Sequence, residues 1–348
     1  MIMKPSTITS ALRAQRAFTL MELLISIAII TLLIFMVAQV LSSATGVTRT
    51  GSKHIDTDTE ARTVFDRMAA DFRQMLKRTD VDYYLKGPVN YTGHGNGHAY
   101  GRRVPTGQQG SDQIAFFSQV LAYTGSASQG TGSPLSLVAY RVNGLSGGAS
   151  YLQLERMGKR LIWNSPPQSG NSPNRPIPMF FLPATMTAVV PDAVNSSGDT
   201  LSVYEVIGPN VFRFEYYYLL KTGLVTDIPW NRDSSANWPV HTSTAGIGLG
   251  DVQAIGVTIA VVDPAGRALI NAASPNSLFD LGSDMADFKT APGRGVGGNR
   301  TFTDLVYSWN QTLVTEIANG QASTGSPIPP EAGKAIRIYN RLFDLRTL

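Results

Sequence analysis

The hydrophobic pattern near the start of the chain predicts a membrane-length helix. No charged residue occurs from Leu23 to Thr48, and the first part of this run, Leu23–Leu41, reads LLISIAIITLLIFMVAQVL. About 20 apolar residues at a rise of ~1.5 Å span a hydrocarbon core of roughly 30 Å. We therefore expect residues 18–41 to form a transmembrane helix that lies in the lipid bilayer.

The charges that precede this helix predict its orientation. Residues 1–17 carry Lys4, Arg13 and Arg16 and no acid. By the positive-inside rule, the N-terminus stays in the cytoplasm and the rest of the chain is exported. Without this segment, the 29 basic and 25 acidic residues of the chain become 26 and 25, so the net charge falls from +4 to +1. The remainder has no basic stripe and no nucleic-acid-binding motif, and we expect no nucleic-acid partner.

Three interpretations of the apolar segment compete. A secretory signal peptide has a shorter apolar core of about 7–15 residues, although Ser42-Ser43-Ala44 would serve as a weak cleavage site after it. A plain signal anchor is the second interpretation. Neither accounts for Glu22, since an acid inside an apolar helix costs about 2.5–3.5 kcal/mol on insertion scales. The simplest alternative for Glu22 is an acid near the helix end that reaches the membrane interface.

The residues around Glu22 resemble the cleavage and methylation motif of type IV prepilins. In that family a short basic leader ends in a small residue, which is usually Gly. The first residue of the mature protein is usually Phe, and the fifth is Glu. In this chain the sequence RAFTLMELL places Ala17, Phe18 and Glu22 at these three positions. The resemblance implies cleavage between Ala17 and Phe18 by prepilin peptidase and N-methylation of Phe18. It also implies that Glu22 serves assembly with other pilin-like subunits on an inner-membrane assembly platform. Ala17 departs from the usual Gly, but Ala is the nearest larger residue, so we expect cleavage to survive there at a lower rate.

Helical periodicity resumes after the membrane segment, so residues 42–79 are expected to continue as an amphipathic helix. Gly46 and Gly51 are expected to loosen or bend it. Its apolar stripe consists of Ile55, Ala61, Val64, Phe65, Met68, Phe72, Met75 and Leu76. The neighbours Arg62–Asp66 and Arg67–Asp71 are expected to pair on the solvent side.

From residue 80 onward the pattern changes to strands and long loops, which predicts a β-rich head over residues 80–348. We expect strands at Asp112–Ser118, Ser136–Val142, Leu152–Arg156, Arg160–Trp163, Val211–Leu220 and Gln253–Val262. The third and fourth of these are expected to form a hairpin about Met157-Gly158-Lys159. Residues 335–345 are expected to close the chain as a last strand or a docked tail. The fold class is therefore α+β, with a long N-terminal helix packed on an antiparallel sheet.

Glycine and proline mark the connections between these strands. Loops are expected at residues 164–178, 274–298 and 319–333, and a turn is expected at Asp263-Pro264-Ala265-Gly266.

The order of the pieces is similar to the J-type minor pseudopilins of type II secretion systems. The matching features are Asp66-Arg67 followed by Asp71 and Arg73, the FEYYY strand, a turn with Trp230, and a strand that closes at Asp263–Gly266. The C-terminal residues 336–341 are also similar to the cassette protein C group of pilin-like proteins named for verrucomicrobial genomes.

Residue patterns that suggest chemistry are weak in this chain. Gly293, Gly295 and Gly298 spell GxGxxG, but no apolar strand leads into it, which favours a loop. His94 and His98 lie among glycines without a third metal ligand, and Asp280, Asp284 and Asp287 do not have EF-hand spacing. Cysteine is absent, which excludes thiol nucleophiles and thiolate metal sites. We therefore expect no catalytic residue, no metal and no cofactor, and a chain that is not an enzyme.

These patterns favour a minor pilin-like subunit, or pseudopilin, of a type II secretion or type IV pilus-like filament machine. Its expected location is the inner membrane as a single-pass protein, with the head in the periplasm. One alternative is a signal-anchored periplasmic binding module or enzyme that carries a prepilin-type N-terminus. A major pilin is the other, although the mature chain would be bulky for a densely repeated subunit.

Overall fold

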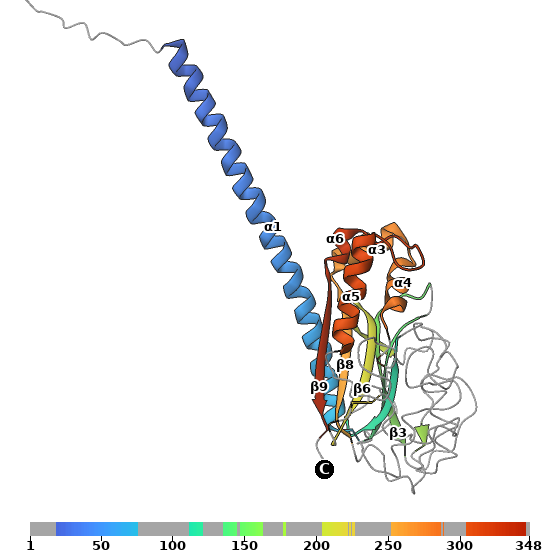
Figure 1. Cartoon of the computed structure of the whole chain (residues 1–348). Coiled ribbons are helices and arrows are strands. Elements are labelled where there is room, and N and C mark those ends of the chain that lie inside the picture. Colours follow the sequence, from blue (N-terminus) through green and yellow to red (C-terminus); the bar gives the residue numbers. More distant parts are fainter. Residues whose placement is uncertain are drawn as a thin grey trace, which may run out of the picture. The chain divides into compact units, whose positions relative to one another are not determined.

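The computed structural model describes residues 19–75, 111–120, 135–144, 147–162, 177–178, 204–221, 223, 225–226, 252–286, 288 and 304–345. The chain divides into two compact units, Met1–Ser52 and Lys53–Leu348. Helix α1 (Leu20–Arg73) belongs to both units (Figure 1).

The membrane-length segment forms the first part of α1. Residues Leu20–Thr45 are long and apolar enough to cross a membrane, and their side chains are exposed along the whole segment. Because apolar side chains point outward in every direction, this surface suits a lipid environment. The helix continues through Gly46 and Gly51, so these residues do not end it. A single glycine costs only about 1 kcal/mol in a helix, and a long helix tolerates it.

The second part of α1 carries the predicted apolar stripe into the core of the head. The stripe residues buried there are Ala61, Val64, Phe65, Met68, Phe72 and Met75. Ile55 is an exception, because its side chain is exposed. The helix ends at Arg73, and Met75 then forms an isolated bridge to Ser118.

Among the described residues, the first sheet of the head contains five strands. They are β1 (Gln113–Ser118), β2 (Ser136–Val142), β3 (Leu154–Ile162), β4 (Ile177–Pro178) and β5 (Tyr204–Gly208). Strands β1, β2, β3 and β5 pair in antiparallel fashion, whereas the short β4 lies parallel to the end of β3.

The second sheet is antiparallel throughout and has the order β7-β6-β8-β9. Its strands are β6 (Val211–Leu220), β7 (Val225–Thr226), β8 (Val252–Val262) and β9 (Ile336–Asp344). Both central strands are buried over almost their full length, which explains their runs of aromatic and β-branched residues. The prediction of a last strand at the C-terminal end of the head is confirmed.

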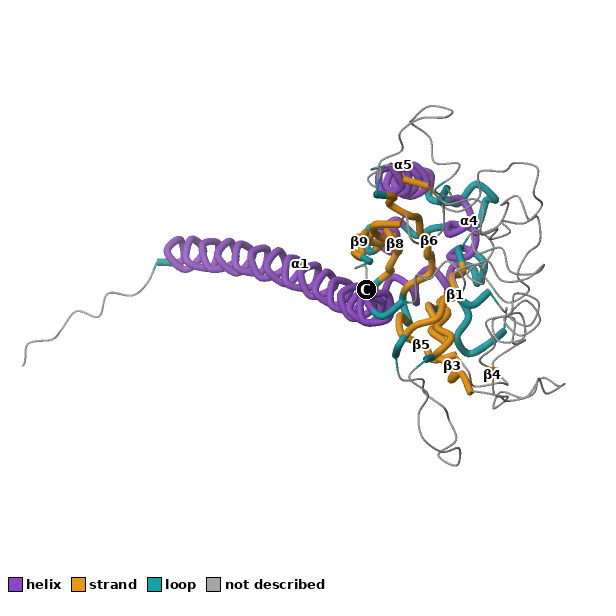
Figure 2. The backbone as a smooth tube through the Cα atoms, turned by 90° about the horizontal axis from the view of Figure 1, so that it is seen from below, coloured by secondary structure: helices purple, strands orange, loops and turns teal. Residues whose placement is uncertain are grey.

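A layer of helices covers the face of the second sheet that lies opposite α1. It consists of α3 (Pro264–Ala273), α4 (Ser277–Asp284), α5 (Asp304–Asn319) and the single turn α6 (Pro330–Gly333). Figure 2 shows β9, β8 and β6 in a row between α5 and the C-terminal end of α1. Two cores result, one between α1 and both sheets and one between the second sheet and the helical layer. The α+β class with antiparallel sheets is confirmed.

The helical layer corrects two sequence-based expectations. The expected loop at residues 274–298 contains α4, and the expected turn at Asp263–Gly266 is the start of α3. Asp263 is the N-cap of that helix, because its carboxylate accepts a hydrogen bond from the Gly266 N–H at 2.7 Å, and Pro264 occupies the first helical position. The expected loop at residues 319–333 contains only the short α6.

The expected hairpin about Gly158 is wrong, because β3 runs through it as one strand. Gly158 pairs with Val138 across the sheet. A Cβ atom at this position would lie 2.8 Å from Nη1 of Arg156, so glycine is present to make room for a guanidinium and not to form a turn.

Candidate functional site

The first candidate site is the start of α1, where Thr19 and Glu22 form a capping box. The Thr19 hydroxyl oxygen accepts a hydrogen bond from the Glu22 N–H at 3.3 Å. In return, the Glu22 carboxylate accepts hydrogen bonds from the Thr19 N–H and the Thr19 hydroxyl, both at 3.1 Å. This reciprocal arrangement satisfies two N–H groups that lack partners within the helix.

The capping box gives Glu22 a local role that sequence reasoning missed. The signal was present as Thr-Leu-Met-Glu before an apolar run, which is the T-x-x-E pattern of a helix start. The carboxylate also lies at the end of the helix where its macrodipole favours negative charge. Helix capping is therefore one reason why an acidic residue occupies this position. Ala17 and Phe18, the other two residues predicted for this site, lie outside the described residues.

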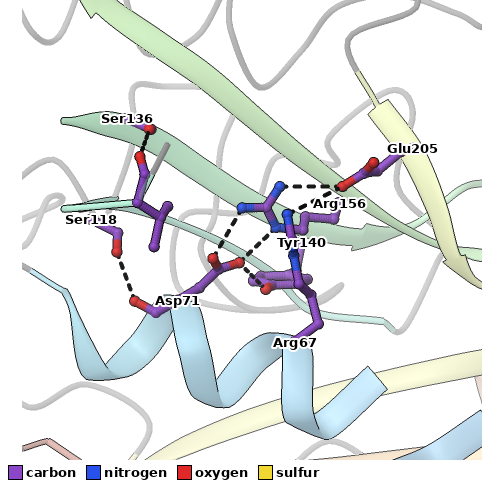
Figure 3. A network of polar contacts seen from close by, with 8 residues as sticks. Arg67, Asp71, Ser118, Ser136, Tyr140, Arg156 and Glu205 are labelled. Carbon is purple, nitrogen blue, oxygen red and sulfur yellow. Dashed lines mark hydrogen bonds and ion pairs between the residues drawn. The ribbon is translucent and has the colours of Figure 1, made fainter. Parts of the chain in front are cut away.

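The second candidate site is the polar joint between α1 and the first sheet. Asp71 is buried, and its carboxylate accepts hydrogen bonds from Nε and Nη2 of Arg156 at 2.6 and 3.0 Å. The Tyr140 hydroxyl donates a further hydrogen bond to the same carboxylate. Figure 3 shows the Asp71 side chain reaching from the helix toward Tyr140 and Arg156 on the sheet.

Strand register explains why these partners meet. Tyr140 on β2 pairs with Arg156 on β3, which in turn pairs with Glu205 on β5. The three side chains therefore form a row across three strands, beneath Asp71. Glu205 accepts from Nη1 of Arg156 at 3.3 Å and lies 3.7 Å from Nη2 of Arg67 on the helix. The joint thus links one turn of α1 to three strands.

Burial and charge together fix the protonation states of this joint. Burial acts to lower the pKa of Arg156, but the hydrogen bond and negative charge of Asp71 outweigh it and raise that pKa. Burial and the Asp71 charge hold the pKa of Tyr140 well above its ordinary value. Arg156 is therefore charged and Tyr140 neutral throughout the physiological range.

Further polar contacts join α1 to the second sheet along the preceding turns. Glu60 accepts from the backbone N–H and the side-chain amide of Asn210, at 2.7 and 2.8 Å. Tyr339 donates to Asp58, and Arg341 donates to Asp66 at 2.8 Å. Acidic side chains of α1 therefore hold the head at several successive turns.

These contacts correct the expectation of solvent-side pairs within the helix. Asp71 is 1% exposed and pairs with a strand residue, not with Arg67. Asp66 pairs with Arg341 from β9, and Arg67 with Glu205 from β5. Local i,i+4 spacing favours pairing in an isolated helix, but partners 85 or more residues away prevail once the helix packs against the sheets.

The remaining sequence candidates gain no chemical role from the structure. Among the residues that the structure describes, no three His, Asp or Glu side chains are placed to hold a metal ion. Asp280 and Asp284 accept hydrogen bonds from hydroxyl groups of the segment 320–328, and Asp284 also accepts one from the Ser323 N–H. The other candidates lie outside the described residues. They are His94 and His98, the glycines of the GxGxxG pattern, Asp287 and Trp230.

Comparison with known proteins bears on the N-terminal site. Residues 12–38 match the family described as the prokaryotic N-terminal methylation motif. This match covers Ala17, Phe18 and Glu22, and it supports a type IV pilin-like protein that prepilin peptidase processes. The apolar part of α1 is a candidate membrane anchor, as such a protein requires. A search of curated proteins found no match.

Proposed function

We propose that this chain is a minor pilin-like subunit, a pseudopilin, of a type II secretion or type IV pilus-like filament machine. Prepilin peptidase removes residues 1–17 on the cytoplasmic side and methylates the new N-terminus at Phe18. The helix then anchors the protein in the inner membrane, with the head in the periplasm, until an assembly platform incorporates it beside other pilin-like subunits. The match of residues 12–38 to the methylation motif is the observation that carries this proposal.

The structure supports an assembly role through the surface of α1. Its segment Leu20–Thr45 presents apolar side chains on all sides, so it can exchange lipid contacts for contacts with neighbouring helices. Its second part is fixed to the head by the Asp71–Arg156 pair and by Glu60, Asp58 and Asp66. A force applied to the helix would thus reach both sheets of the head.

Glu22 has a second role in this proposal besides the capping box. Cleavage at Ala17 creates a positively charged amine at Phe18, and a carboxylate and an ammonium are each costly in hydrocarbon. In a filament, Glu22 of one subunit meets the amine of a neighbour, and each charge offsets the cost of burying the other. This pairing favours one register of assembly.

The finer assignment within the class is a J-type minor pseudopilin. The order of Asp66-Arg67, Asp71, the FEYYY strand and the Asp263–Gly266 segment that follows β8 favours it. The alternative is a signal-anchored binding module or enzyme, in which the head alone would act and the helix would serve only as an anchor.

In-cell photo-crosslinking separates these functions. A photoreactive residue at Phe35, whose side chain is exposed on the apolar helix, is placed in the full chain in its native host. A filament subunit is expected to give crosslinks to other proteins with prepilin-type N-termini. A probe at Val314, equally exposed on α5 of the head, shows whether the crosslinks are specific to the apolar helix. Crosslinks from Phe35 to lipid alone, with the machine fully assembled, would contradict the proposal.

A further inference from the structure

The outer edge of β9 presents main-chain hydrogen-bonding groups that the head itself does not use. Within the described residues, β9 ends the second sheet, since it pairs with β8 on one side and with no strand on the other. Figure 2 shows it at the end of the row β9, β8, β6. An edge strand of this kind is a template on which a further strand can add.

The hydrogen bonds at the two ends of β9 show which of its residues face outward. The Leu345 N–H donates to the Gln253 carbonyl at 2.8 Å, and the Ala335 carbonyl accepts from the Asp263 N–H at 3.4 Å. In an antiparallel strand the N–H and C=O of one residue point to the same side, and the side alternates along the chain. The odd-numbered residues therefore bond to β8. The residues whose main-chain groups point outward in the central part of the strand are Ile338, Asn340 and Leu342.

These outward groups are open for pairing. In the part of the chain that the structure describes, the outward N–H and C=O groups of Ile338, Asn340 and Leu342 have no hydrogen-bond partner. The preceding outward carbonyl, that of Ile336, accepts from the Arg337 guanidinium at 3.4 Å. At a rise of about 3.4 Å per residue, an incoming strand of roughly five residues pairs with all three open positions.

This edge also lacks most of the features that prevent strand addition. Natural edge strands are often short or bulged, or they carry Pro or Lys. Strand β9 spans nine residues, pairs with β8 without a register shift, and contains no Pro, Gly or Lys. The strand at the opposite edge of the described sheet, β7, has only two residues. The β9 edge is therefore the one that suits a partner strand.

The edge lies beside the second part of α1 and runs in the same direction. In order along β9, the contacts with α1 are Tyr339 with Asp58, Arg341 with Asp66 and Phe343 with Phe72. Ile55 lies one turn before Asp58 on the same face of α1, and its side chain is 65% exposed. Leu342 is 37% exposed on the other face of the sheet. Apolar side chains thus flank the open edge on both faces.

We propose that the outer edge of β9 accepts an extended strand from the head of another pilin-like subunit. This inference rests on the proposed function, which places neighbouring subunits in one membrane with their helices parallel. The open main-chain groups bind the strand, and the alternating side chains select it. The matching strand is apolar at the positions beside Ile338 and Leu342, and polar at the positions beside Tyr339 and Arg341.

A second copy of this chain does not fit this edge in a membrane. Two β9 edges related by a two-fold axis would pair in antiparallel fashion. Because β9 runs parallel to the second part of α1, the two helices would then point in opposite directions. Two such chains do not enter one membrane from the same side. This geometry favours a different subunit as the occupant.

In-cell photo-crosslinking of the full chain in its native host tests the site. A photoreactive residue at Ile55 is expected to crosslink to a head peptide of another protein with a prepilin-type N-terminus. With this probe in place, Leu342→Pro removes an outward N–H and is expected to lower the crosslink by about tenfold, the factor that one main-chain hydrogen bond contributes. Leu342→Thr is the matched control. It keeps the N–H and the preference for a strand, so it is expected to retain the crosslink.

The strand addition is overturned by an equal crosslink in Leu342→Pro or by an equal loss in Leu342→Thr. It is also overturned by an Ile55 crosslink to a second copy of this chain, or to a protein without a prepilin-type N-terminus. Absent Ile55 crosslinks with intact Phe35 crosslinks overturn this inference alone, whereas the absence of both overturns the proposed function as well. If Leu342→Pro does not fold, Leu342→Lys replaces it, because Lys on a strand edge repels an added strand. An undiminished crosslink in that variant overturns the inference.

Discussion

Asp71 on α1 and Arg156 on β3 form a buried ion pair in which the two carboxylate oxygens accept from Nε and Nη2 at 2.6 and 3.0 Å. The pair fixes the rotation of the helix about its own axis, because a guanidinium binds a carboxylate in this two-point manner only in one relative orientation. The side of α1 that faces the sheets is thereby determined by one contact as well as by the apolar stripe.

Removal of Asp71 is expected to destabilise the head strongly. Asp71→Ala leaves the buried Arg156 guanidinium with only the half-exposed Glu205 as a counter-charge, and breaking a buried pair in this way typically costs about 3–5 kcal/mol. Asp66→Ala is the matched control on the same helix, since Asp66 pairs with Arg341 at the surface and such pairs contribute about 0–1 kcal/mol. Urea unfolding of both variants measures the difference. Equal losses of stability would show that the Asp71 pair does not fix the helix to the sheet.

The head is expected to fold without the apolar part of α1. A fragment of residues 53–348 retains the second part of α1 and both cores, so it should be soluble. Its circular dichroism spectrum should combine strand signal with helix signal from α1, α3, α4 and α5. An unfolded spectrum, or one with helix signal alone, would contradict the fold.

The stability of the head is expected to fall as pH rises toward 8. The pKa of Glu316 is about 8 in the folded chain, against ~4.3 for an unperturbed Glu, so the folded state holds its proton more tightly. The resulting stabilisation is complete below about pH 4 and is lost as pH rises through 8. Glu316→Gln should lack this slope in urea midpoints measured from pH 5 to 9. A parallel slope in the variant would assign the pH dependence to other groups.

The two roles of Glu22 are separable by a pair of substitutions. Glu22→Gln keeps a capping-box acceptor but removes the charge, whereas Glu22→Ala removes both. If charge pairing with a neighbour's amine drives assembly, both variants should insert in the membrane, be cleaved at Ala17 and lose crosslinking from Phe35. If only capping matters, Glu22→Gln should crosslink as the unmodified chain does and Glu22→Ala should not. Undiminished crosslinking in both variants would remove Glu22 as an assembly determinant.

Local patterns predicted much of the fold. The bounds of Ser136–Val142 and Val211–Leu220 agree with β2 and β6, because unbroken runs of β-branched and aromatic residues mark buried strands. The apolar stripe of α1 was also visible from its spacing. The turn predicted at Asp263-Pro264 is a helix start, because the same dipeptide begins both turns and helices. For α5, the local signal is the helical spacing of the apolar residues Leu305, Trp309 and Leu313.

The contacts that hold the head together were beyond sequence reasoning. Asp71 and Arg156 are 85 residues apart, and no local pattern relates them. The space for the guanidinium comes from a glycine, Gly158, which the sequence marks equally well as a turn. The capping box of Thr19 and Glu22 was within reach, since its four-residue pattern is local.

Processing at Ala17 and Phe18 is the central claim, and mass spectrometry of the N-terminal peptide of the mature protein from its native host tests it most directly. The account predicts a peptide that begins at Phe18 and carries one methyl group on its α-amine. A chain with residues 1–17 intact, or a mature terminus near Thr45 after a signal-peptide cut, would contradict the pilin-like function.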